Sequence, residues 1–172
     1  QPMPIPLKLA LFDRASGAHR GEELVILDED RAEVTFDGFT EKPILSINRT
    51  FSAPVTIERD VSREELVFLA EKDDDPFARY EAMQELMTGY LVGSVSGDLD
   101  ESESEAARGD IAEAMKAVVE DDQLDDLMRG ELLMMPSQSY IGEQMLVADP
   151  GAIHAAREAL KTDLGTRLGE SL

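Results

Sequence analysis

The chain has 172 residues, 42% of them hydrophobic, and carries 37 acidic against 16 basic side chains, for a net charge of −21. This length suits one compact unit or two small ones with a real core. So acidic a surface repels the phosphates of nucleic acids and of anionic membranes, so we expect neither as a partner.

The chain contains no cysteine, which excludes disulfides, thiolate catalysis and cysteine-based zinc sites. The first residues, Gln1–Pro6, have neither a charged start nor a continuous apolar run, so we expect no signal peptide. A chain that starts with Gln suggests an excised or processed product. No apolar run reaches the length of a membrane span, and we expect a cytoplasmic location.

The first part of the chain has the pattern of β-strands. Short apolar or alternating runs bounded by turn residues predict five strands, over residues 7–12, 23–27, 32–36, 44–48 and 55–58. A complete immunoglobulin-like sandwich has about seven strands. We therefore predict a partial sandwich, whose open sheet edge would permit self-association.

From Ser62 onward the apolar residues follow a helical period. Ser62 and Glu65 fit a capping box, and Asp75-Pro76 fits a cap followed by proline in the first turn. Three more helices and a short fifth are predicted around residues 111–118, 124–132, 137–145 and 150–168. Helices of similar length joined by short turns are typical of antiparallel pairs stacked as in an α-solenoid.

The segment from Gly93 to Asp100 is rich in Ser, Gly and acidic residues, which predicts a linker between helices. Together these patterns predict an α+β fold. A partial immunoglobulin-like β-sandwich occupies residues 1–60, and an α-helical, α-solenoid-like region of antiparallel helix pairs occupies residues 61–172.

The histidines do not form a zinc site in the sequence. A zinc hydrolase typically places two His four residues apart on a helix, with Glu beside the first. Only His19 and His154 are present, and each is isolated. We interpret His19 as a solvated turn residue and His154 as a surface or packing residue of the last helix.

Other chemical motifs are equally weak. The acidic runs 73–75, 98–105 and 121–126 lack the alternating oxygens, the Gly and the closing Glu of a calcium loop, and the first is explained by helix capping. Gly93–Gly97 has the Gly-x-Ser-x-Gly spacing with Val95 where a nucleophilic Ser belongs. The glycosylation sequon at Asn48 is interpreted as a chance match. No catalytic, cofactor-binding or metal-ligating residue is predicted.

Six blocks of sequence carry a resemblance to a known family. They occur in the order Pro6–Asp13, Lys42–Val55, Glu65–Leu69, Asp74–Ala82, Met135–Ser137 and Asp149–Glu158. This ordered set closely resembles bacterial aminopeptidase N, the alanyl aminopeptidase family of gluzincin zinc metallopeptidases, and covers nearly the whole chain. The most specific part is Phe-Ser-Ala-Pro-Val from Phe51, followed by Asp-Pro-Phe-x-Arg from Asp75.

The resemblance implies a position inside a longer enzyme. In that family a small β-sandwich follows the catalytic domain and leads into a C-terminal helical domain that covers the active site. The zinc-binding His-Glu-x-x-His, the distal Glu ligand, the Gly-Ala-Met-Glu-Asn loop and the catalytic Tyr lie upstream, and none matches a position here. Zinc is implied for the parent enzyme and no cofactor for this fragment. Residues 93–105 depart from the family pattern and resemble a variable insertion.

The leading hypothesis is a non-catalytic structural and capping fragment of an enzyme that removes N-terminal amino acids from peptides. Its partners would be the catalytic domain of the same polypeptide and the parent's peptide substrates, and alone it would be inactive. The alternatives are a free-standing acidic helical scaffold for protein interactions and a divalent-cation buffer.

Overall fold

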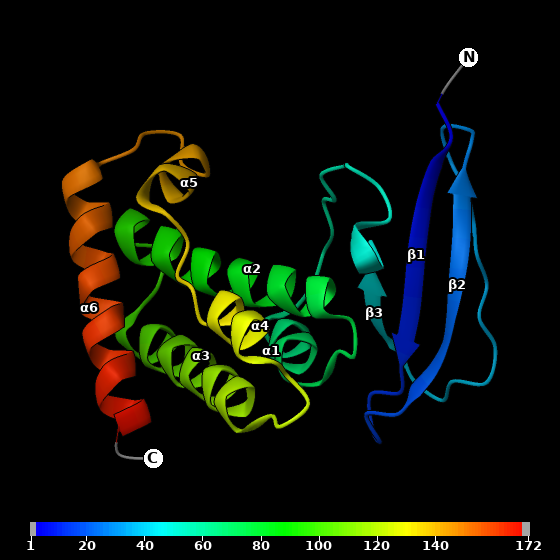
Figure 1. Cartoon of the computed structure of the whole chain (residues 1–172). Helices are drawn as coiled ribbons and strands as arrows, with labels where there is room; N and C mark the ends of the chain where they lie inside the picture. Colours follow the sequence, from blue (N-terminus) through cyan, green and yellow to red (C-terminus); the bar gives the residue numbers. More distant parts are fainter. Residues whose placement is uncertain (1–2, 170–172) are drawn as a thin grey trace.

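The fold was obtained as a computed structural model in which residues 3–169 are described (Figure 1). The predicted ranges 1–60 and 61–172 extend to Gln1, Pro2 and residues 170–172, which lie outside the described residues. A small antiparallel sheet comes first and six helices follow, so the predicted α+β class is confirmed.

The sheet has three strands in the order β2-β1-β3: β1 (Ile5–Phe12), β2 (His19–Leu27) and β3 (Ile44–Ile47). Both pairings are antiparallel, and the register between β1 and β2 shifts between Ala10 and Phe12. Because side chains alternate across a strand, one face of the sheet presents Phe12 and Ile44 to the helices. Phe12 there meets the ring of Phe68, with ring centroids 5.5 Å apart.

Three of the five predicted strands are confirmed, and two are wrong. Residues 32–36 and 55–58 form no strand, although Val34 and Phe36 alternate with polar residues as a strand requires. Alternation gives a strand only where a neighbour accepts the backbone hydrogen bonds. Among the described residues neither segment has such a neighbour, so both run as irregular backbone.

The helical part begins after a short 3₁₀ turn, η1 (Arg49–Phe51). The helices are α1 (Arg63–Lys72), α2 (Pro76–Ser96), α3 (Glu101–Glu120), α4 (Asp126–Leu132), α5 (Gln138–Glu143) and α6 (Pro150–Gly169). The predicted capping box is present, since Ser62 accepts from the Glu65 amide and Glu65 accepts from the Ser62 amide. No helix of residues 3–169 is long and apolar enough to cross a membrane.

The predicted linker at 93–100 is a tight corner between two helices. α2 continues to Ser96, and only four residues precede α3. Gly97 closes α2 at φ 74°, a left-handed conformation that suits glycine, and the Asp98 amide donates to the Gly93 carbonyl at 2.9 Å. Asp100 then caps α3. The Ser, Gly and acidic residues serve helix ends, which the composition did not distinguish from a flexible linker.

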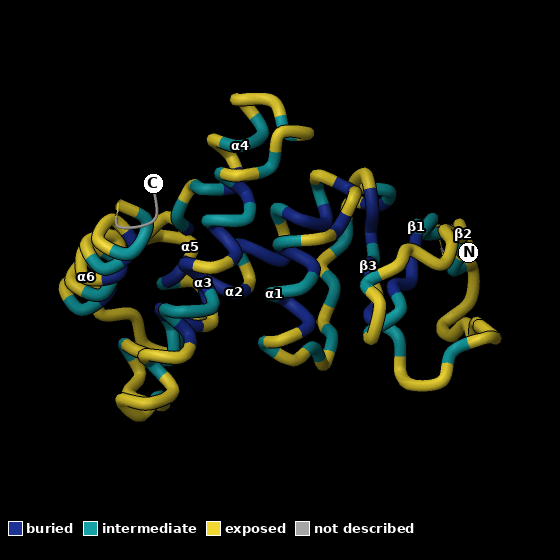
Figure 2. Tube along the Cα trace, turned by 90° about the horizontal axis from the view of Figure 1, so that it is seen from below, coloured by how far each residue is buried: buried dark blue, intermediate teal, exposed yellow. Residues whose placement is uncertain are grey.

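The core is one continuous cluster around α2. Met83, Met87 and Leu91 are fully buried on this helix, and buried residues of α1, α3 and α6 pack around them. Figure 2 shows the buried positions gathered where α1, α2 and α3 meet, with the outer side of α6 exposed. Ala10, Phe12 and Ile44 of the sheet belong to the same cluster, so the two parts share one core.

Candidate functional site

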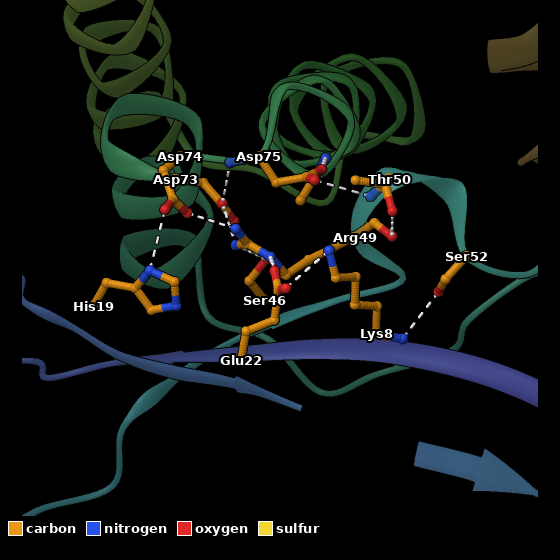
Figure 3. A network of polar contacts seen from close by, with 11 residues as sticks. Lys8, His19, Glu22, Ser46, Arg49, Thr50, Ser52, Asp73, Asp74 and Asp75 are labelled. Carbon is orange, nitrogen blue, oxygen red and sulfur yellow. Dashed lines mark hydrogen bonds and ion pairs between the residues drawn. The ribbon is translucent and has the colours of Figure 1, made fainter. Parts of the chain in front are cut away.

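The junction between sheet and helices is built around a buried arginine. Arg49 follows β3 and is only 3% exposed. Its guanidinium donates to Glu22 of β2 at 3.0 Å, to Asp73 at 2.7 Å and to Asp74 at 2.6 Å, the last two lying between α1 and α2 (Figure 3). The guanidinium makes a fourth hydrogen bond, at 3.2 Å, to the hydroxyl oxygen of Ser46 on β3. One side chain thus ties two strands to the α1–α2 corner.

Charge and burial oppose each other in this network. Burial of Arg49 disfavours its charged form, yet the hydrogen bond to Asp74 and the charges of Asp73 and Asp74 outweigh that and raise its pKa. Burial raises the pKa of Asp73, and its bonds from Ser46, the Asp75 amide and Arg49 only partly offset this. The Asp73 carboxylate is fully enclosed, so it depends on Arg49 for its counter-charge.

The turn that carries Arg49 is conformationally unusual. Asn48, Thr50 and Phe51 have φ of 59°, 55° and 52°. In this left-handed region residues other than glycine are disfavoured by roughly 1–2 kcal/mol each. Asn48 holds its end of the turn, because its side-chain oxygen accepts from the Ala53 amide at 2.9 Å and its nitrogen donates to the Ala53 carbonyl at 3.1 Å. With that amide buried and engaged, the chance-match interpretation of the sequon agrees with the structure.

Asp75 connects this turn to α2. One of its oxygens accepts from the Ala78 amide at 2.8 Å, the predicted cap, and the other accepts from the Thr50 amide at 2.9 Å. The capping interpretation of residues 73–75 is therefore correct for Asp75 and incomplete for Asp73 and Asp74. These two acids are the partners of Arg49.

An apolar groove lies beside the left-handed turn. The ring of Phe51 is 55% exposed and lies 5.1 Å from the ring of Phe77, centroid to centroid. The groove encloses about 440 Å³, and its lining residues are Thr50, Phe51, Asp75, Pro76, Phe77, Tyr80, Met128 and Glu131. Burial, with the charges of Glu81 and Glu131 nearby, raises the pKa of the Tyr80 hydroxyl. The groove thus has an apolar floor and an acidic edge.

The structure separates the two histidines. His19 begins β2, its Nδ1 lies 3.1 Å from a carboxylate oxygen of Asp74, and its ring contacts Phe12. His19 is exposed, as its interpretation as a solvated residue requires, but it stands at the start of a strand and not in a turn, and it pairs with Asp74. His154 lies on α6, 3.0 Å from the side-chain nitrogen of Gln138, at the far end of the molecule from β2 (Figure 1). Among residues 3–169 no three His, Asp or Glu side chains are grouped to hold a metal ion.

The other acidic runs serve helix ends and ion pairs. Asp100 and Asp125 cap α3 and α4. Asp121 accepts a hydrogen bond from Arg79 at 2.6 Å, and that buried arginine also donates to the Ala70 carbonyl. The Gly-x-Ser-x-Gly segment ends α2, as described above, and exposes no nucleophile elbow.

Sequence reasoning missed the Arg49 network and the groove. The three acidic partners of Arg49 lie 24 to 27 residues away, beyond the reach of helical or strand periodicity. Two signals were available. An arginine directly follows an apolar strand, and three consecutive acids stand where a helix cap needs only one.

Two family models together match nearly the whole chain. A family model described as a domain of unknown function with an Ig-like fold, DUF3458, matches residues 1–60, and its companion DUF3458_C, described as ARM repeats, matches residues 63–172. Both descriptions agree with the predicted fold class.

Three curated relatives are called aminopeptidase N. The one from Caulobacter vibrioides is 34% identical over 153 residues, covering 89% of this chain and 17% of that protein. The one from Escherichia coli is 28% identical over 179 residues, covering 100% and 20%. The one from Haemophilus influenzae is also 28% identical. The chain thus spans about a fifth of the length of these relatives.

A solved structure has the same fold. Aminopeptidase A of Legionella pneumophila, in complex with aspartic acid, superposes with a TM-score of 0.81 at 27% identity, over 97% of this chain and 19% of that one.

Proposed function

The chain belongs to the aminopeptidase N family, and we propose that it is a non-catalytic bracing and capping module of a zinc-dependent enzyme that removes N-terminal residues from peptides. The observation that carries the proposal is the end-to-end match to about a fifth of proteins named aminopeptidase N. The catalytic residues of such an enzyme belong to the other four fifths.

The shared core and the Arg49 network support the bracing role. A brace transmits position only if its parts do not move against each other. Here the sheet contributes Phe12 and Ile44 to the helical core. Arg49, which is held on the sheet side by Glu22 and Ser46, adds two hydrogen bonds across the junction, to Asp73 and Asp74. Close-packed interiors of this kind are stiff, so residues 1–60 and 61–172 act as two units held in one fixed arrangement.

The helical unit supplies the capping role. Stacked helices present extended surfaces of low conformational entropy, suited to walling a chamber that admits peptides and excludes folded proteins. The net charge of −21 attracts the positively charged amino termini of peptides. In this proposal zinc belongs to the catalytic part, peptides are the substrates of the whole enzyme, and the enzyme is cytoplasmic.

The coding sequence and the whole polypeptide test the proposal. We expect a reading frame that continues upstream through a His-Glu-x-x-His motif, and a purified whole polypeptide that hydrolyses an aminoacyl anilide until a chelator removes its zinc. A start codon directly before Gln1 would instead support the free-standing scaffold, and a whole polypeptide without peptidase activity would refute the proposal.

A further inference from the structure

The groove beside Phe51 has features that the bracing role does not require. Phe51 extends from a left-handed backbone and is 55% exposed. A phenyl ring that is more than half exposed gains little from burial, and the left-handed conformation is unfavourable for it. Yet three hydrogen bonds of Asn48 and one from the Thr50 amide to Asp75 hold the turn in place. Strain of this kind persists where the presented side chain has a use.

The composition of the groove is that of an interface centre. Phe51, Phe77, Tyr80 and Met128 supply aromatic and thioether surface, the residue types enriched where proteins meet. The groove is also already formed, because Phe77 and Tyr80 stand on α2 and Met128 on α4. A partner side chain would therefore enter without the cost of ordering the site.

We infer that this groove is the docking surface for the catalytic part of the same polypeptide, receiving an aromatic, Leu or Met side chain flanked by Lys or Arg. The inference rests on the proposed function. About four fifths of the relatives' length lies outside this chain, so a large partner surface exists in such a protein. The exposed carboxylate of Glu131 at the groove edge pairs with the flanking basic residue.

Charge distinguishes this occupant from a second copy of the chain. Two copies carry −21 each and repel one another, and a copy brings a strongly acidic surface to the acidic edge of the groove. A partner with a basic residue beside its apolar anchor meets attraction at the same place.

Cysteine labelling tests the inference directly, because the chain has no cysteine of its own. The variant Phe51→Cys is made in the isolated chain and in the whole polypeptide, and mass spectrometry follows maleimide labelling of the peptide that contains residue 51. Leu146→Cys, at a fully exposed apolar position in the α5–α6 loop, calibrates the reagent in the isolated chain. We expect comparable labelling of both variants there, and labelling of Cys at 51 slowed about tenfold or more in the whole polypeptide.

Each other outcome overturns the inference. Equal labelling at position 51 in the isolated chain and the whole polypeptide means that nothing covers the groove. Labelling that slows as the isolated chain is concentrated identifies a second copy as the occupant. A reading frame that contains no catalytic part removes the partner altogether.

Two further measurements separate this inference from the proposed function. Hydrolysis of an aminoacyl anilide is measured on the same samples. Protection of residue 51 without hydrolysis would refute only the proposed function. Hydrolysis without protection of residue 51 would refute only the docking surface. Phe51→Arg should leave the melting temperature of the isolated chain unchanged and lower that of the whole polypeptide. A similar change in both would assign Phe51 to the folding of the chain alone.

Discussion

Replacing Arg49 with Met is expected to destabilise the chain strongly at neutral pH. Arg49 is 3% exposed, and the side chain of Asp73 is completely enclosed. Removing one partner of a buried ion pair leaves the other charge without compensation, which costs about 3–5 kcal/mol. Because small domains are stable by only about 5–15 kcal/mol, Arg49→Met should remove a large part of the free energy of unfolding.

Urea denaturation followed by circular dichroism measures this loss. The matched control is Arg59→Met, since Arg59 pairs with Glu85 on the surface at 3.0 Å and such pairs contribute under about 1 kcal/mol. The double variant Arg49→Met with Asp73→Asn should recover part of the loss. Asn carries no charge, and its oxygen still accepts from the Asp75 amide, as Asp73 does at 2.9 Å.

Two results would refute the reasoning about the buried pair. One is a loss for Arg49→Met no larger than that for Arg59→Met. The other is a double variant no more stable than Arg49→Met alone, which would mean that the unpaired Asp73 carboxylate is not the source of the cost.

Two other predictions concern the helix corner and pH. Gly97→Ala places a side chain at φ 74° and should destabilise the chain by roughly 1 kcal/mol or more. Gly89→Ala, in open space within α2, should instead stabilise the chain by about 0.5–1 kcal/mol. Thermal melts of both variants measure the two effects, and equal effects would contradict the prediction. Burial raises the pKa of Glu71 above its ordinary 4.5, so the folded chain takes up that proton first and stability rises as the pH falls from neutrality. The hydrogen bond from Arg79 lowers the pKa of Asp121 below its ordinary 3.8, so stability falls again as the pH drops through that range. The stability from Glu71 is complete below its ordinary pKa of 4.5, and that from Asp121 is complete above its ordinary 3.8, so melting temperatures should peak near about pH 4. A continuous fall from pH 7 downward would contradict this assignment.

Local signals in the sequence predicted most of the helical part. The Ser62–Glu65 capping box and the Asp75-Pro76 start occur as predicted, because capping depends only on residues within one turn of the helix. The corner at Gly97 was misjudged, since the same residues end a helix or form a linker. Only the positive φ and the bond to Gly93 distinguish the two.

The parts that sequence reasoning missed depend on contacts between distant residues. Residues 32–36 alternate like a strand yet have no partner strand among the described residues. Arg49 gave no periodic signal, because its acidic partners come from β2 and from the corner between α1 and α2. The groove likewise brings Phe51 to residues of α2 and α4, which only the three-dimensional arrangement places together.

The most direct test of the central claim is to measure zinc and peptidase activity in the purified chain by itself. A non-catalytic module is expected to retain no stoichiometric zinc after dialysis and to give no chelator-sensitive hydrolysis of an aminoacyl anilide. One tightly held zinc per chain, together with hydrolysis that a chelator abolishes, would contradict the account.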